Sequence, residues 1–173
     1  MHQFISYISM LWIPVSQIWQ HNTIITSMGQ AKTMFETVFW DTAAFVALSN
    51  AKDDLHQMAI NVSHDLAKAE ARVLTTDAVL IEVVNTFSKV AWRQTAWQII
   101  KAMQESVALK MATIVHVDFG LWQRGWKLHR SRADKEWGLT DCISFVVMEE
   151  HNIIQAFTYD HHFEQAGFIC LLK

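Results

Sequence analysis

Acidic residues recur in this sequence close to the ends of short apolar segments. Four such segments are residues 37–40, 73–76, 112–117 and 154–159, and the acids that follow them are Asp41, Glu82, Asp118 and Asp160. Asp141 is a fifth acid, at the predicted start of a helix. Ligands of open α/β sheets bind beyond the carboxyl ends of the strands, so we ask whether these acids meet at one edge of a sheet.

Each acid alone has a simpler explanation. An Asp at a helix start accepts hydrogen bonds from free backbone N–H groups and favours the positive end of the helix dipole, the role we expect for Asp77 and Asp118. Glu82 lies off the apolar face of its predicted helix, where water can solvate it.

Together the acids indicate a metal site. Several carboxylates at one edge would repel one another unless a cation lay among them. Oxygen ligands select hard cations such as Mg²⁺ or Mn²⁺ rather than zinc. A metal of this kind can activate water and stabilise the leaving oxygen during phosphodiester hydrolysis. The spacing of the acids therefore allows a metal-dependent phosphoesterase.

The elements that would position these acids alternate along the chain. The four apolar segments are predicted strands, and residues 168–172 could add a short edge strand. Helices are predicted at 42–49 and 54–72, after Asp77, from Trp92 to Val107, at 118–129 and at 141–150, with Thr140 as the cap of the last. The alternation predicts an α/β sandwich with a mostly parallel sheet, and the strands are apolar on both faces, as helices on both sides require.

Four motifs resemble those of PIN domains, in the family's order. They are VFWDTAAFVAL at 38–48, TTDAVLIEVVN at 75–85, DKEWGLTDCISF at 134–145 and TYDHHFEQAGF at 158–168, of which the last two are the most specific. The resemblance implies a PIN-like three-layer sandwich over residues 34–173, with a mostly parallel sheet of four to five strands flanked by helices. PIN domains of this kind are typically metal-dependent ribonucleases, and many are VapC-type toxins inhibited by a small cognate antitoxin.

The resemblance also implies roles for individual residues. By position in the motifs, the catalytic, metal-binding acids would be Asp41, Glu82, Asp141 and Asp160, with Asp41 and Asp141 closest to the metal. Thr42 and Thr140 would orient carboxylates or waters. Asp134 would serve local structure.

The function implied is an Mg²⁺- or Mn²⁺-dependent endoribonuclease that hydrolyses RNA with metal-activated water. Its expected partners are RNA, a cognate antitoxin and a second copy in a homodimer. The alternative is a PIN domain that binds RNA or protein without cutting; the presence of all four acids favours the enzyme. A structure-specific DNA nuclease is disfavoured by the small size of the chain.

A local basic run precedes Asp141, in a chain whose formal net charge is −3. It is either a solvated helix end or a patch that steers RNA phosphates, and it consists of Arg124, Lys127, Arg130, Arg132 and Lys135.

Aromatic residues and histidines leave further alternatives open. Core burial is the expectation for the helical tryptophans Trp92, Trp97, Trp122 and Trp126, and a dimer or antitoxin surface is the alternative. The pair His161 and His162 lacks a Cys or third His at zinc-ligand spacing, so we expect a structural role, and the alternative is that one of the pair contacts RNA or the antitoxin. His116 and His129 are expected to be incidental.

Cysteine use and the N-terminal segment bear on location. Cys142 and Cys170 form no disulfide framework and are predicted to be buried in a cytoplasmic protein.

Residues 1–33 differ in composition from the rest and are treated as an N-terminal extension. Three explanations are open: a start assigned too early, with Met34 as the true first residue; an extra helix or flexible appendage; or a weak membrane contact. The apolar stretch at 4–19 is interrupted by Pro14 and too short for a confident transmembrane helix, so no stable membrane association is expected.

Overall fold

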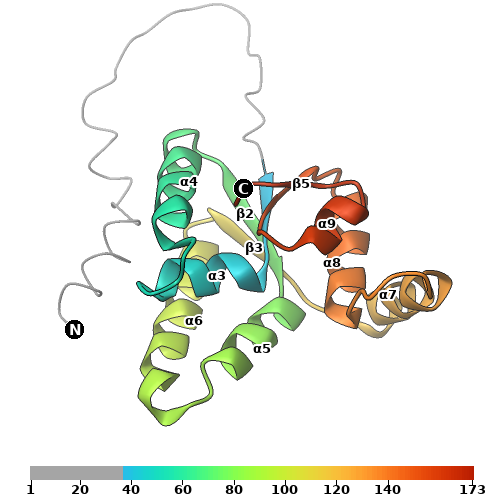
Figure 1. The fold of residues 1–173 in the computed structure, drawn as a ribbon, viewed down its shortest axis with the longest axis horizontal. Helices are drawn as coiled ribbons and strands as arrows, with labels where there is room; N and C mark the ends of the chain where they lie inside the picture. The colour runs from blue at the N-terminus through green and yellow to red at the C-terminus, as the bar shows by residue number, and fades with distance from the viewer. Residues whose placement is uncertain (1–36) are drawn as a thin grey trace, which may run out of the picture. The chain divides into compact units, whose positions relative to one another are not determined.

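A single parallel sheet organises the part of the chain that the computed structural model describes, residues 37–173. Its order is β3-β2-β1-β4-β5, and every neighbouring pair is parallel (Figure 1). The strands are β1 (Thr37–Trp40), β2 (Arg72–Thr76), β3 (Ala112–Val115), β4 (Gln155–Phe157) and β5 (Ile169–Cys170). The predicted sheet is confirmed, while the expectations for residues 1–33 lie outside the described residues.

Seven α-helices and one 3₁₀ turn connect these strands in the described region. They are α3 (Thr42–Ser49), α4 (His56–Lys68), α5 (Asp77–Thr86), η1 (Val90–Trp92), α6 (Arg93–Ala108), α7 (Phe119–Ser131), α8 (Leu139–Glu150) and α9 (His161–Gln165). The five-residue helix α9 was not predicted, because it is too short to show a helical period.

The core has two parts because successive strand residues point to opposite faces of the sheet. Val38 of β1 packs in a cluster with small residues of α3 and α4, whereas Phe39 packs in a larger cluster with residues of α5, α6 and α8. Helices therefore cover both faces, as the apolar strands predict.

Two helix starts differ from the predictions. The N-cap of α5 is Thr76, whose hydroxyl accepts from the Val79 N–H at 3.1 Å, and Asp77 is the first helical residue. Asp77 instead accepts from the Val117 N–H at 3.0 Å, which ties α5 to the segment after β3. The N-cap of α8 is Gly138 rather than Thr140, so the helix begins before the predicted start.

Helices α7 and α8 pack against each other and are joined by residues 132–138. Arg124 of α7 forms an ion pair with Glu150 near the end of α8, at 2.8 Å. Gly125 lies against Ile143, where a Cβ on the glycine would stand 2.5 Å from Cγ1 of the isoleucine. The two helices therefore approach closely only because residue 125 has no side chain.

No helix within residues 37–173 is both long enough and apolar enough to cross a membrane.

We expect Gly125→Ala to destabilise the protein by about 1–3 kcal/mol, because the added methyl group overpacks the contact with Ile143. Gly120→Ala is the matched control on the same helix, since its Cβ would meet the flexible end of Arg124 at 3.3 Å. Urea unfolding followed by circular dichroism measures both variants. Equal stability of the two would contradict the proposed close approach of α7 and α8.

Candidate active site

Asp41 lies directly after β1 and is the most buried acid of the site. Its side chain is 7% exposed, and it caps α3 by accepting from the Ala43 N–H. The same oxygen, Oδ2, accepts from the Thr158 hydroxyl at 2.9 Å. Because β1 and β4 are neighbours, Thr158 follows its strand beside Asp41, although the two residues are 117 positions apart.

Asp160 and Asp141 are held by a second set of hydrogen bonds. Asp160 caps α9 by accepting from the His162 N–H at 2.8 Å, and its own N–H donates to the Thr158 hydroxyl at 3.0 Å. Asp141, in the first turn of α8, accepts from the Gly138 N–H at 2.8 Å. The His162 ring places Nδ1 at 3.2 Å from Asp141 and 3.5 Å from Asp160.

Glu82 joins this group through Thr42. The Thr42 hydroxyl donates to Glu82 Oε2 at 3.0 Å, so the residue after Asp41 orients a carboxylate of α5. For Thr140, the structure records no hydrogen bond of the hydroxyl to any residue of the described region.

The electrostatics of the site reflect burial and crowding of like charges. Burial raises the pKa of Asp41 to about 6, against hydrogen bonds from Thr158 and the backbone that lower it, and the nearby Asp141 adds a smaller upward contribution. Burial also raises the pKa of Asp141, opposed by the Gly138 N–H, and Asp160 raises it further. Burial and neighbouring carboxylates therefore disfavour the charged forms of Asp41 and Asp141 in the absence of a cation.

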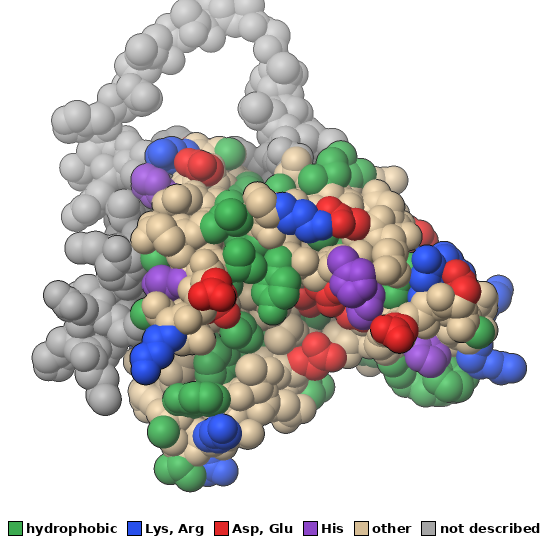
Figure 2. All heavy atoms as spheres, in the orientation of Figure 1, with side chains coloured by type: hydrophobic (Ala, Val, Ile, Leu, Met, Phe, Trp, Pro, Cys, Tyr) green, Lys and Arg blue, Asp and Glu red, His purple; other side chains and the backbone are tan. Residues whose placement is uncertain are grey.

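The donor set fits a divalent cation. Hydrogen bonds engage one oxygen each of Glu82, Asp141 and Asp160, which leaves a second oxygen on each without a hydrogen bond to the described part of the chain. Figure 2 shows acidic and histidine side chains gathered near the centre of the face in view. Ligand atoms of Asp160, His161 and His162 lie within 4.8 Å of one another, so a ring nitrogen is also available beside the oxygens.

The acids named from the sequence do not all lie in the site. Asp41, Asp141 and Asp160 come together directly and Glu82 through Thr42, whereas Asp118 caps α7 by accepting from the Leu121 N–H at 2.7 Å. The predicted cap role of Asp118 is confirmed. Asp134 pairs with Arg132 at 3.0 Å, in keeping with the local structural role expected of it.

Two residues of the group, Thr158 and His162, were not predicted to belong to it. Both stand beside Asp160 in sequence, and that closeness was the available signal. A local role was expected for the histidine pair because the sequence shows no third nitrogen or sulfur ligand, but a carboxylate can complete such a set.

Cys142 and Cys170 are buried, as predicted. Burial raises the pKa of each thiol to about 11, so both remain protonated near neutral pH and neither acts as a nucleophile in the site.

The basic run is divided by its ion pairs. Arg124 pairs with Glu150, and both Arg132 and Lys135 pair with Asp134. The remaining two, Lys127 and Arg130, have no acidic partner within residues 37–173. The expectation of core burial for the helical tryptophans is wrong, because all four are exposed: Trp92, Trp97, Trp122 and Trp126.

Comparison with known proteins gives a consistent picture. The family model described as "PIN domain" matches residues 38–169. The 23S rRNA-specific endonuclease VapC20 of Mycobacterium tuberculosis is 27% identical over 135 residues, which cover 76% of this chain and 95% of the relative.

Solved structures show the same similarity. The crystal structure of Mycobacterium tuberculosis VapC20, described as a sarcin–ricin loop cleaving toxin, aligns with a TM-score of 0.64 at 26% identity over 76% of this chain and 96% of that one. VapBC2 of Rickettsia felis, bound to a DNA fragment of its promoter, aligns with a TM-score of 0.56 at 16% identity, over 78% of this chain and 96% of that one, and supports the fold alone.

We expect Asp41→Asn to stabilise the metal-free protein above about pH 6. The raised pKa means that the folded state binds a proton more tightly than the unfolded state, so stability falls as the pH rises from the unfolded value of 3.8 to about 6. At pH 8 the variant escapes this cost, on the order of 2 kcal/mol or roughly 5 °C in Tm. Thermal melts in EDTA at pH 4 and pH 8 measure the difference.

The exposed acid Asp134, which pairs with Arg132, supplies the control, because Asp134→Asn should bring no stabilisation at pH 8. If Asp41→Asn melts below the wild type at pH 8, burial of the Asp41 charge is not costly and the electrostatic account of the site fails.

Proposed function

Because this chain belongs to the PIN domain family, we propose that it is a metal-dependent endoribonuclease and the toxin of a toxin–antitoxin pair. The observation that carries the proposal is the meeting of Asp41, Asp141 and Asp160 beyond the ends of β1 and β4, with Glu82 joined through Thr42. Residues 34–173 are proposed to be the functional unit.

The four acids have distinct roles in this proposal. Asp41 and Asp141 hold the metal ion, while Glu82 and Asp160 complete the set of oxygen donors, directly or through water. Bound Mg²⁺ or Mn²⁺ supplies the Lewis acidity that activates water against the RNA phosphodiester. Carboxylate oxygens suit both ions equally well.

The hydroxyl groups and His162 position these acids. Thr158 fixes Asp41 and Thr42 fixes Glu82, each through a hydrogen bond at or below 3.0 Å. The His162 ring lies between Asp141 and Asp160, and its contact with Asp141 opposes the rise in the pKa of that carboxyl. Thr140 is proposed to orient water in the site.

RNA is the proposed substrate because the relative VapC20 is a 23S rRNA-specific endonuclease that aligns over most of the described chain. The second candidate, a module that binds without cutting, is weaker on physical grounds. Burying Asp41 next to Asp141 costs stability that a module without a metal would have no reason to bear.

The proposed partners are a cognate antitoxin and a second copy of the chain, and the proposed location is the cytoplasm. An exposed apolar surface suits such protein partners, and it is formed on α5, η1 and α6 by Ile81, Val84, Val90, Trp92 and Trp97.

We expect Asp141→Asn to lower cleavage of cellular RNA at least 100-fold, since it removes a charged ligand of the metal. The assay incubates the full-length protein with total RNA, with Mn²⁺, with Mg²⁺ or with EDTA, and resolves the fragments on a gel. Asp134→Asn lies in the same sequence motif but outside the site, and it should cleave like the wild type. Cleavage that persists in EDTA, or in Asp141→Asn, would contradict the metal-dependent mechanism.

A further inference from the structure

Four aromatic rings stack in a line along the exposed side of α7. Phe119 and Trp122 have centroids 6.2 Å apart with planes at 9°, Trp122 and Trp126 are 6.0 Å apart at 15°, and Trp126 and His129 are 5.4 Å apart at 11°. We call these four residues the aromatic ladder. The sequence spacing of three and four residues places all of them on one side of the helix.

The aromatic ladder lies away from the core. Leu121 and Gly125 are the buried residues of α7, and Gly125 faces α8. In contrast, Phe119 is 72% exposed and both Trp122 and Trp126 are 40% exposed. Large aromatic side chains left in water form the kind of apolar patch that marks an interaction surface.

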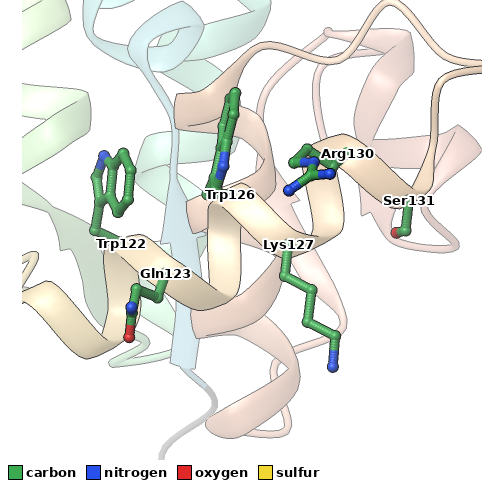
Figure 3. A pocket seen from close by; sticks show the side chains of 6 residues that line it. All are labelled: Trp122, Gln123, Trp126, Lys127, Arg130 and Ser131. Carbon is green, nitrogen blue, oxygen red and sulfur yellow. The ribbon is translucent and has the colours of Figure 1, made fainter.

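Positive charge without an acidic partner in the described region is carried by the same helix as the rings. Trp122 and Trp126 line an open groove of about 430 Å³ together with Gln123, Lys127, Arg130 and Ser131. Figure 3 shows that all six come from one helix, with Arg130 next to Trp126 and Lys127 extending from the other side of the helix. The planes of the two indole rings differ by 15°. Lys127 and Arg130 are the two members of the basic run without an acidic partner in the described region, so their charge is available to an anion.

The aromatic ladder lies on a helix that packs against α8, the helix that carries Asp141. Arg124 meets Glu150 near the end of α8, and Gly125 meets Ile143 near its beginning. Residues 132–138 join the end of α7 that carries His129 to the first turn of α8, which carries Asp141. A strand bound along α7 would lead toward the carboxylates.

We propose that the aromatic ladder, with Lys127 and Arg130, binds unpaired nucleotides of an RNA loop. The bases stack on the rings and the phosphates pair with the two cations, a combination typical of surfaces that bind single-stranded nucleic acid. Paired bases are already stacked within a duplex, so the surface discriminates loops from helices. This proposal rests on the proposed ribonuclease function and assigns its substrate a recognition surface outside the acidic site.

RNA fits this face better than a protein partner does. A protein would have to supply acids to both Lys127 and Arg130 and a cover for the parallel rings, whereas one polynucleotide strand carries planar bases and phosphates in alternation. The exposed apolar side chains of α5, η1 and α6 are aliphatic as well as aromatic, a composition that suits protein.

Binding to two RNA probes tests the proposal. Full-length protein carrying Asp141→Asn, which prevents cleavage, is titrated into a labelled RNA hairpin with an unpaired loop and into a fully paired duplex with the same stem. Adding Trp122→Ala and Trp126→Ala together should weaken loop binding at least tenfold and leave duplex binding unchanged. Replacing both by Phe should retain most of the loop affinity, because Phe keeps a ring for stacking.

Controls separate stacking from charge and from folding. Leu109→Ala, which truncates an exposed apolar side chain that follows α6, should leave loop affinity unchanged. Lys127→Gln with Arg130→Gln should weaken binding to the loop and reduce its salt dependence. Circular dichroism melts verify that each variant is folded.

Three outcomes would overturn the proposal: loop affinity that is unchanged in the double Ala variant, equal loss for loop and duplex, or a change from dimer to monomer in sedimentation with RNA binding intact. The last outcome would make the face an interface between copies. Cleavage by protein with Asp141 intact is scored separately. If the protein cleaves RNA but the Trp122→Ala and Trp126→Ala changes leave loop binding unaffected, only the proposed role of the aromatic ladder is wrong. If loop binding depends on the aromatic ladder but the protein cleaves no RNA, only the proposed nuclease function is wrong.

Discussion

Carboxylates that gather at the carboxyl edge of the sheet repel one another, and the structure around them must offset this repulsion. Asp41, Asp141 and Asp160 each occupy the start of a helix, where the positive end of the helix dipole offsets part of their charge. Backbone N–H groups and the Thr158 hydroxyl fix one oxygen of each acid. Helix capping and site formation are thus one arrangement: the interactions that begin α3, α8 and α9 also hold the acids in place to receive a cation.

The framework of the fold could be predicted from local pattern. Strand β1 and helix α3 have the predicted bounds, because a short apolar run followed by a capping Asp specifies both. The resemblance of the four motifs to PIN domains selected the acids that the structure brings together. The sequence pattern alone also made Asp118 a candidate for the acidic site. In the structure Asp118 instead accepts a hydrogen bond from the Leu121 N–H and caps α7.

What the sequence could not supply depends on contacts between distant segments. His162 matters because α9 brings its ring between two acids, and α9 is shorter than two helical turns. The exposure of Trp122 and Trp126 follows from which side of α7 meets α8, and Gly125 decides that by its close contact with Ile143. Thr76 displaces Asp77 as a cap because Asp77 binds the backbone of Val117 instead.

The pairing of the central strands has a consequence for folding kinetics. Asp41 and its partner Thr158 are 117 positions apart, because β4, which precedes Thr158, is the neighbour of β1 in the sheet. Pairing these strands closes a long loop, and the entropy lost in that closure precedes the contacts that compensate for it. The local helices can therefore form before the acids meet, and completion of the acidic site depends on a slow, long-range step of folding.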